Sequence, residues 1–207
     1  MIIALSSPKH GTGVTTTAAM TALTLATTGP TVLIDLAGDQ HAALGLSDPQ
    51  AHQAVAVTDH LKLIDASDLS PDEQARIVTD TAESGDHVVI DAGDADHPIR
   101  DLLPDDTRRL WVLRLCYLAL RRAMACTRRP DSIVVVREPQ RALTTLDIEA
   151  ALGIPVEAAI DIDPAIARTV DAGLLAARIP RSAAPALATI ITTDALTVVA
   201  SSMAHTP

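Results

Sequence analysis

The sequence predicts an α/β protein in which a doubly wound, mainly parallel sheet of about six or seven strands is flanked by helices. Short aliphatic runs recur without polar alternation, as is typical of strands covered on both faces. Segments of helical period separate these runs, and such alternation predicts crossovers between parallel strands. Hydrophobic residues make up 48% of the 207 residues and charged residues 20%, which predicts a single packed domain over residues 1–207.

The first half of the chain holds three strand-like runs and two helical segments. The runs are residues 1–6 (MIIALS), 31–35 (TVLID) and 87–91 (HVVID). Residues 15–28 and 71–84 have the period of helices, so we expect them to cross over between the strands. The loop at 47–57 carries the weakest signal.

The second half repeats this alternation. Its strand-like runs are residues 110–115 (LWVLRL), 132–137 (SIVVVR) and 154–160 (IPVEAAI). Its expected helices cover 117–127, 144–152, 164–173 and 182–203, the last with Pro185 near its start.

Aromatic residues are almost absent from the chain. There is one Trp, one Tyr and no Phe, so the core must be built from Ala, Val, Ile and Leu. A nucleic-acid site that relies on stacking bases on an aromatic platform is therefore disfavoured.

Charge is distributed unevenly. The net charge is −10, yet residues 108–141 contain nine arginines and only two acidic residues, a local balance of +7. Arg121, Arg122, Arg128 and Arg129 fall along one face of an expected helix and its continuation. This segment suggests a protein partner or non-specific binding to DNA backbone, and the alternative is a solvated, salt-bridged face.

A glycine-rich loop joins the first strand to the first helix, reading SPKHGTGVTT over residues 7–16. Such a turn presents backbone N–H groups to an anion, and the helix dipole adds to the attraction. The usual phosphate-binding motif G-x-x-x-x-G-K-[ST] is not met, because Val14 stands where its lysine belongs. Thr15 is placed to offer a hydroxyl to Mg²⁺. Lys9 is one of only two lysines, the other being Lys62.

This loop resembles the deviant Walker A motif, K-G-G-x-G-K-[ST], of the dimerising ParA/MinD/CpaE ATPases, a P-loop family. The resemblance departs at His10 and Val14, and it implies that Lys9 reaches the nucleotide of the partner in a homodimer. It implies that ATP binds with Mg²⁺ at the loop residues, which are Lys9, His10, Gly11, Thr12, Gly13, Val14, Thr15 and Thr16.

Three later segments resemble the same family in the expected order. Asp35 and Asp91 each close an aliphatic run, and the resemblance makes them metal-site residues together with Thr15. Asp163 and Pro164 match the loop beside the adenine, and Arg137 stands where the family commonly has an asparagine that reads adenine. Because arginine offers a different hydrogen-bonding pattern, GTP or no nucleotide stays open beside ATP.

The catalytic residues depart further from the family pattern. Ala37 replaces the aspartate that orients the attacking water in the family, so we assign that role to Asp39, with Lys9 as the other catalytic residue. Two missing electrostatic groups predict slow or absent ATP hydrolysis, a weak ATPase at most. The implied function is an ATP-dependent dimerisation switch that positions or partitions a cellular cargo.

Two alternatives remain open. One is a pseudo-ATPase scaffold that acts by protein contact without turnover. The other is a ligase of the dethiobiotin synthetase type, which Gly11-Thr12-Gly13-Val14 resembles in part.

The sequence also bears on location. It contains no apolar run of about 18 residues, and residues 186–207 have no Lys or Arg, so we expect no membrane anchor of the MinD type. Cys116 and Cys126 fit no metal motif and are expected to be buried thiols. Together these features predict a cytoplasmic protein.

Overall fold

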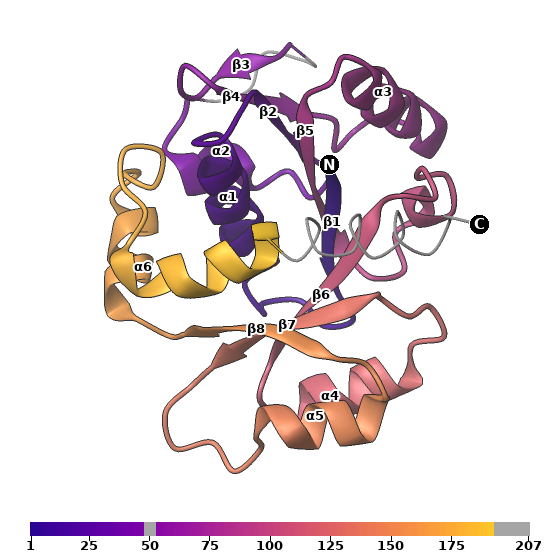
Figure 1. Ribbon diagram of the computed structural model, residues 1–207, viewed down its shortest axis with the longest axis vertical. Coiled ribbons are helices and arrows are strands. Elements are labelled where there is room, and N and C mark those ends of the chain that lie inside the picture. The colour runs from indigo at the N-terminus through magenta and orange to yellow at the C-terminus, as the bar shows by residue number, and fades with distance from the viewer. Residues whose placement is uncertain (48–52, 193–207) are drawn as a thin grey trace, which may run out of the picture.

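The computed structural model describes residues 1–47 and 53–192. Its strands are β1 (Ile2–Ser7), β2 (Thr31–Asp35), β3 (Val55–Ala56), β4 (Leu61–Asp65), β5 (His87–Asp94), β6 (Arg108–Arg114), β7 (Ser132–Arg137) and β8 (Val156–Asp161). Its helices are α1 (Val14–Leu25), α2 (Gln40–Leu44), α3 (Pro71–Glu83), α4 (Tyr117–Ala125), α5 (Thr145–Leu152) and α6 (Pro164–Asp171), with short 3-10 turns η1 (Pro98–Asp101) and η2 (Arg181–Ala183) and a further helix over 184–192 (Figure 1).

The strands form one sheet in the order β3-β4-β2-β5-β1-β6-β7-β8. Every pairing is parallel except that of β3 with β4. The chain moves from β1 to one side through α1 and β2, and later crosses to the other side through β6. Ligands of open parallel sheets bind beside the carboxyl ends of strands at such a reversal, which places the loop after β1 at the expected position. The predicted fold class is confirmed.

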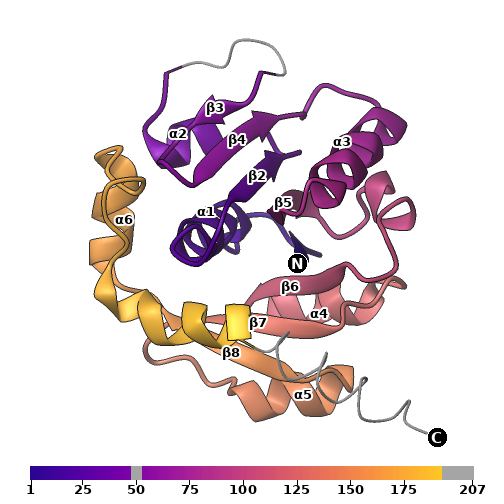
Figure 2. The ribbon, with the colours of Figure 1, turned by 45° about the horizontal axis from the view of Figure 1, so that its top comes forward.

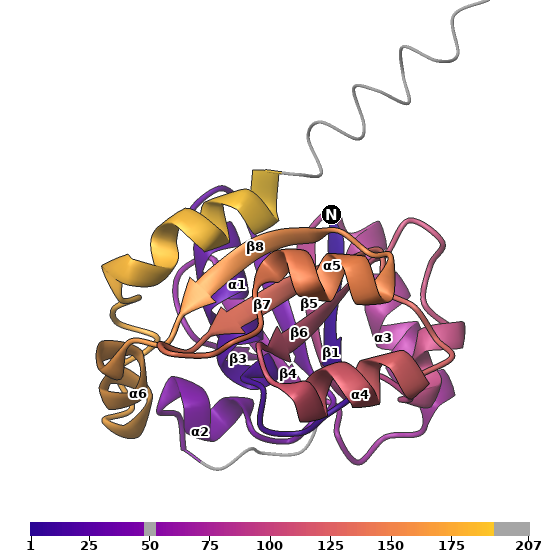
Figure 3. The ribbon, with the colours of Figure 1, turned by 90° about the horizontal axis from the view of Figure 1, so that it is seen from below.

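Helices cover both faces of the sheet (Figure 2). Along β1, Ile3 and Leu5 pack with α1 and the helix over 184–192, whereas Ile2 and Ala4 pack with α3 and η1. On that second face a further cluster joins α4 and α5 to Trp111 and the neighbouring strands; Figure 3 shows these two helices side by side. The unbroken apolar runs predicted this two-sided burial.

The sheet has eight strands, two more than the six runs identified in the sequence; the additional strands are β3 and β4. In β4, Leu61 and Leu63 are buried while Lys62 between them is exposed, so a charge interrupts the aliphatic run that marks the other parallel strands. The two-residue β3 pairs with β4 within the weakly determined 47–57 region. Residues 48–52 of that region lie outside the described residues.

Several boundaries differ from those expected. Helix α1 ends at Leu25 rather than residue 28, and α4 ends at Ala125 rather than 127. The last helix is described only over 184–192, so the predicted continuation to 203 lies outside the described residues.

The two cysteines are unpaired and partly exposed, so the prediction of buried thiols was wrong in its degree of burial. In the described part of the chain, none of the helices has the length and apolar character needed to cross a membrane.

Candidate functional site

The loop between β1 and α1 has the backbone of an anion cradle. Gly11 and Gly13 have φ angles of +74° and +98°, which residues with a side chain rarely adopt. Gly13 is the N-cap of α1 and gives no side-chain cap. Among the described residues, the backbone N–H groups of residues 11–16 find no acceptor. A row of free amides at the start of a 12-residue helix attracts an anion.

The charged side chains of this loop lie at its surface. The ammonium group of Lys9 donates a hydrogen bond of 3.0 Å to the carbonyl oxygen of His10. The imidazole of His10 lies 3.4 Å from the carboxylate of Asp94 and is largely exposed. Lys9 therefore contacts its own loop and no carboxylate of the described chain.

Val14 and Thr12 differ in what they bring to the site. Val14 is buried in the core with α1, so the position of the usual P-loop lysine packs apolar partners. Thr12 is 1% exposed, and its hydroxyl oxygen has no hydrogen-bond partner among the described residues. A buried hydroxyl without a partner is costly, and it lies in the cradle that an anion would fill.

Two fully buried aspartates lie side by side, Asp35 at the carboxyl end of β2 and Asp91 within β5, and the two are in register. The carboxylate of Asp35 accepts backbone N–H bonds from Ala37, Gly38 and Gln40 at 2.8 to 2.9 Å. Burial raises the pKa of Asp35, and these amides oppose the rise. Asp35 thus holds the loop after β2 in place, since both its oxygens have backbone partners.

Burial has a marked effect on the pKa of Asp91. Burial, with the nearby charge of Asp35, raises its pKa to about 6, against opposing hydrogen bonds from Gln40, Thr15 and the backbone of Gly93. The amide Nε2 of Gln40 donates to Asp91 at 2.8 Å and to the carbonyl of Thr15 at 3.0 Å. Gln40 therefore connects α1, β5 and the loop after β2.

The loop after β2 places the remaining predicted catalytic residue in solvent. Asp39 is exposed and stands at the N-cap of α2 without a side-chain cap bond. Ala37 is also exposed and offers only a methyl group. No group of three or more acidic, His or Cys side chains in the described chain is arranged to hold a metal ion alone.

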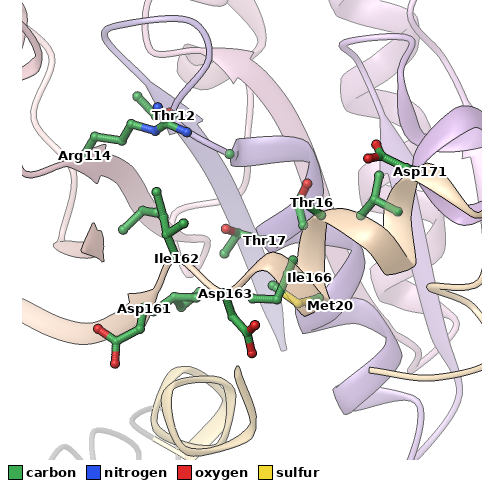
Figure 4. A pocket seen from close by; sticks show the side chains of 15 residues that line it. Thr12, Thr16, Thr17, Met20, Arg114, Asp161, Ile162, Asp163, Ile166 and Asp171 are labelled. Atoms are coloured by element: carbon green, nitrogen blue, oxygen red, sulfur yellow. The ribbon is translucent and has the colours of Figure 1, made fainter. Parts of the chain in front are cut away.

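A cleft of about 220 Å³ opens beside the loop, between α1 and the segment from β8 to α6. Figure 4 shows Arg114 and Thr12 at one end and Asp171 at the other. Most of its wall is apolar, and the lining residues are Thr12, Gly13, Thr16, Thr17, Met20, Arg114, Val136, Ile160, Asp161, Ile162, Asp163, Ile166, Ala167, Val170 and Asp171.

The cleft wall contains Arg114 and not Arg137, the arginine that was predicted to lie beside the base. Arg137 forms a two-pronged ion pair with Asp161, at 2.7 and 2.9 Å, and does not line the cleft. Arg114 lines it instead, held by Glu138 at 3.0 Å. The Nε of Arg114 is buried without a partner among the described residues.

Asp163 borders the cleft as the N-cap of α6. Its carboxylate accepts from the backbone of Ala165 at 2.7 Å and from the hydroxyl of Ser182 at 2.6 Å. These two hydrogen bonds lower its pKa. Pro164 occupies the first turn of α6 and is not part of the cleft wall.

Two residues that the structure places beside the loop and the cleft, Gln40 and Arg114, were not among the predicted site residues. Gln40 was missed because glutamine carries no motif signal; its position five residues after Asp35 was the available clue. Arg114 was counted only within the basic segment, although its place at the end of a strand could have marked it.

The basic segment is partly neutralised by ion pairs. Within the described chain, five of its arginines form ion pairs, and these are Arg108 with Glu157, Arg114 and Arg141 with Glu138, Arg128 with Asp101, and Arg137 with Asp161. Arg128 and Arg129 follow the end of α4, so the predicted helical face of four arginines was wrong. Only Arg121 and Arg122 lie on the helix, both exposed.

Family models and curated proteins give no match to this chain. Solved structures do. A ParA family ATPase from Chlorobium tepidum TLS has a TM-score of 0.75 at 16% identity, covering 90% of this chain and 95% of its own. MinD with Mg-ADP from Pyrococcus horikoshii gives 0.75 at 16%, covering 91% and 93%. The MinC:MinD complex of Aquifex aeolicus gives 0.73 at 19%, covering 91% and 92%.

This chain has the ParA/MinD fold. The likeness covers about nine-tenths of the chain and confirms the doubly wound, mainly parallel sheet that the sequence predicted. In this ParA/MinD fold, the glycine loop, the aspartate pair and the cleft all lie along the carboxyl edge of the central strands.

Proposed function

We propose that this chain binds a purine nucleoside triphosphate with Mg²⁺ at the loop after β1 and uses it as a dimerisation switch. The observation that carries the proposal is the row of free amides over residues 11–16 at the N-terminus of α1. They would hold the phosphates, and the apolar cleft beside them would hold the base. Among proteins of similar fold, MinD from Pyrococcus horikoshii is complexed with Mg-ADP and a Cyanothece McdA variant with ATP.

The residues beside the loop suit the binding of Mg²⁺ together with a nucleotide. Thr15 lies at the first turn of α1 and hydrogen bonds to Asp91; its hydroxyl would face the ion. Asp91 would hold the ion through water. A cation beside it would favour the ionised form of this carboxylate, which burial disfavours. When bound, the ion would neutralise charge between the phosphates. Asp35, bonded to three backbone amides, would position the loop after β2.

The same geometry predicts little hydrolysis. The lysine position of the motif is a buried valine, and Ala37 offers no carboxylate to water. Asp39 would have to orient the water, and Lys9 would have to supply charge from the partner of a homodimer. We therefore infer a slow ATPase at most, acting as a switch for positioning or partitioning a cargo. The scaffold without turnover remains the second candidate, favoured by Val14 and Ala37.

Sedimentation and thermal unfolding with Mg-ATP and Mg-GTP test the proposal. At 100-fold excess over Kd, binding stabilises by about 2.7 kcal/mol, a rise in Tm of roughly 5–10 °C for a chain of this size. Lys9→Ala should keep this rise but lose the dimer, whereas Lys62→Ala, at an exposed site on β4, should keep both. An unchanged Tm and sedimentation coefficient with either nucleotide would refute the proposal.

Phosphate release separates the two candidates. The switch predicts slow release above background that Lys9→Ala removes. Dimerisation without any release would instead establish the scaffold.

A further inference from the structure

A second hollow lies on the other side of Asp163 from the cleft. It encloses about 500 Å³ between α6 and residues 174–182, the segment that Figure 1 shows folding back beside α6 before the last helix begins. Three arginines line it, Arg168 from α6 and Arg178 and Arg181 from the returning segment.

These arginines differ from those of the basic segment. Within the described chain, none of the three has a carboxylate within ion-pair distance, and their side chains form no hydrogen bond there. In a chain of net charge −10, three guanidinium groups around one hollow concentrate positive charge that is offset only by the electrostatic interaction of Arg168 with Asp163.

The single carboxylate in the wall is already occupied. Both oxygens of Asp163 accept hydrogen bonds, one from the backbone of Ala165 and one from Ser182. The bond to Ser182 also fixes the returning segment against the start of α6, which sets the spacing of the arginines. The wall thus carries three positive groups against one negative group, with Leu174 contributing an apolar portion.

We propose that this hollow, bounded by Arg168, Arg178 and Arg181, binds a small phosphate-bearing anion. Guanidinium groups give several N–H donors in a fixed plane that matches phosphate oxygens. Three of them, contributed by two separate segments, suit a tetrahedral anion better than a planar carboxylate. The site is distinct from the loop after β1 and does not depend on nucleotide binding there.

NMR of the arginine side chains of the full-length protein tests the site locally. Inorganic pyrophosphate is titrated at constant ionic strength, without Mg²⁺, and the Nε–Hε resonances are followed after assignment by substitution. The resonances of Arg168, Arg178 and Arg181 should shift and saturate together, while that of Arg76, an exposed arginine on α3, stays in place. Binding at the glycine loop leaves these resonances unaffected, so the two sites are told apart.

Variants complete the test. The double variant Arg178→Gln, Arg181→Gln should raise the Kd for pyrophosphate, as read from the saturation of the Arg168 resonance, by about tenfold or more, because two charge-assisted contacts are lost. Arg76→Gln should leave it unchanged. Shifts that stay linear in pyrophosphate, or that match those of Arg76, overturn the site. Equal saturation by succinate overturns its phosphate class.

Discussion

Gln40 shows what one uncharged residue contributes to a charged site. It is fully buried, and its amide nitrogen serves both Asp91 and the carbonyl of Thr15, while its backbone N–H serves Asp35. It thereby lowers the pKa of Asp91 against the effect of burial. Because Gln40 donates hydrogen bonds to both buried aspartates, a neutral side chain helps them to lie side by side.

Gln40→Leu should therefore destabilise the fold by about 2–3 kcal/mol at pH 7.5, since it leaves a buried carboxylate oxygen and a carbonyl without a donor. The loss should shrink at pH 5, where Asp91 is mostly protonated. Urea unfolding at the two pH values measures both effects.

Gln74→Leu is the matched control. Gln74 is also buried, and its amide donates to the carbonyl of Ala66 at 2.9 Å rather than to a carboxylate. Its loss should be smaller and independent of pH. Equal pH dependence in the two variants would contradict the role given to Gln40.

At the scale of elements, two glycines decide how α6 lies against α2. Gly45 ends α2 with a φ of +72°, and a Cβ at that position would lie 2.2 Å from the carbonyl oxygen of Gly173, which follows α6. The two backbones touch, so α6 is held where it can form one wall of the cleft. The sequence predicted α6 but not this contact, because a glycine pair 128 positions apart has no periodic signal.

Gly45→Ala should cost the strain of a left-handed alanine, about 1–2 kcal/mol, and a further 1–3 kcal/mol for the overlap. Gly153→Ala separates these terms, because Gly153 ends α5 at a φ of +66° and its Cβ would meet nothing within 4 Å. It should show the strain alone in chemical unfolding. If both variants lose the same free energy, the packing of α6 on α2 does not depend on this contact.

For the whole molecule, the sequence predicted the repeating strands and helices and missed contacts between residues that are far apart in the chain. Two-sided burial leaves continuous aliphatic runs, so the six predicted strands and the order of the site loops were readable. Strand β4 was missed because Lys62 breaks its run. The apolar part of the cleft wall was missed because Ile162 and Ile166 become neighbours of α1 only through the sheet order. Ion pairing also altered the basic segment, since charge counts along a chain ignore partners such as Glu157 and Asp101.

The stability of the whole fold should carry the signature of Asp91. Its pKa is about 6 in the folded protein, against 3.8 for an ordinary aspartate side chain. Because the native state binds this proton more tightly than the unfolded state, the contribution of Asp91 to stability rises as pH falls through 6. Between pH 7.5 and pH 5 the gain is about 1–2 kcal/mol.

Asp91→Asn removes this titration, so the difference in unfolding free energy between the parent and the variant should change by that amount in favour of the parent at pH 5. Asp147→Asn provides the opposite sign, because hydrogen bonds from Thr144 lower the pKa of that exposed carboxylate; its benefit is present at neutral pH and is lost on acidification. Urea unfolding across pH 4 to 8 measures the first difference, whereas the second appears only below the ordinary pKa of 3.8 and needs measurements below pH 4. A parent-to-Asp91→Asn difference that stays constant with pH would show that burial does not raise the pKa of Asp91 in β5, and that its carboxylate needs no neighbouring cation to stay ionised.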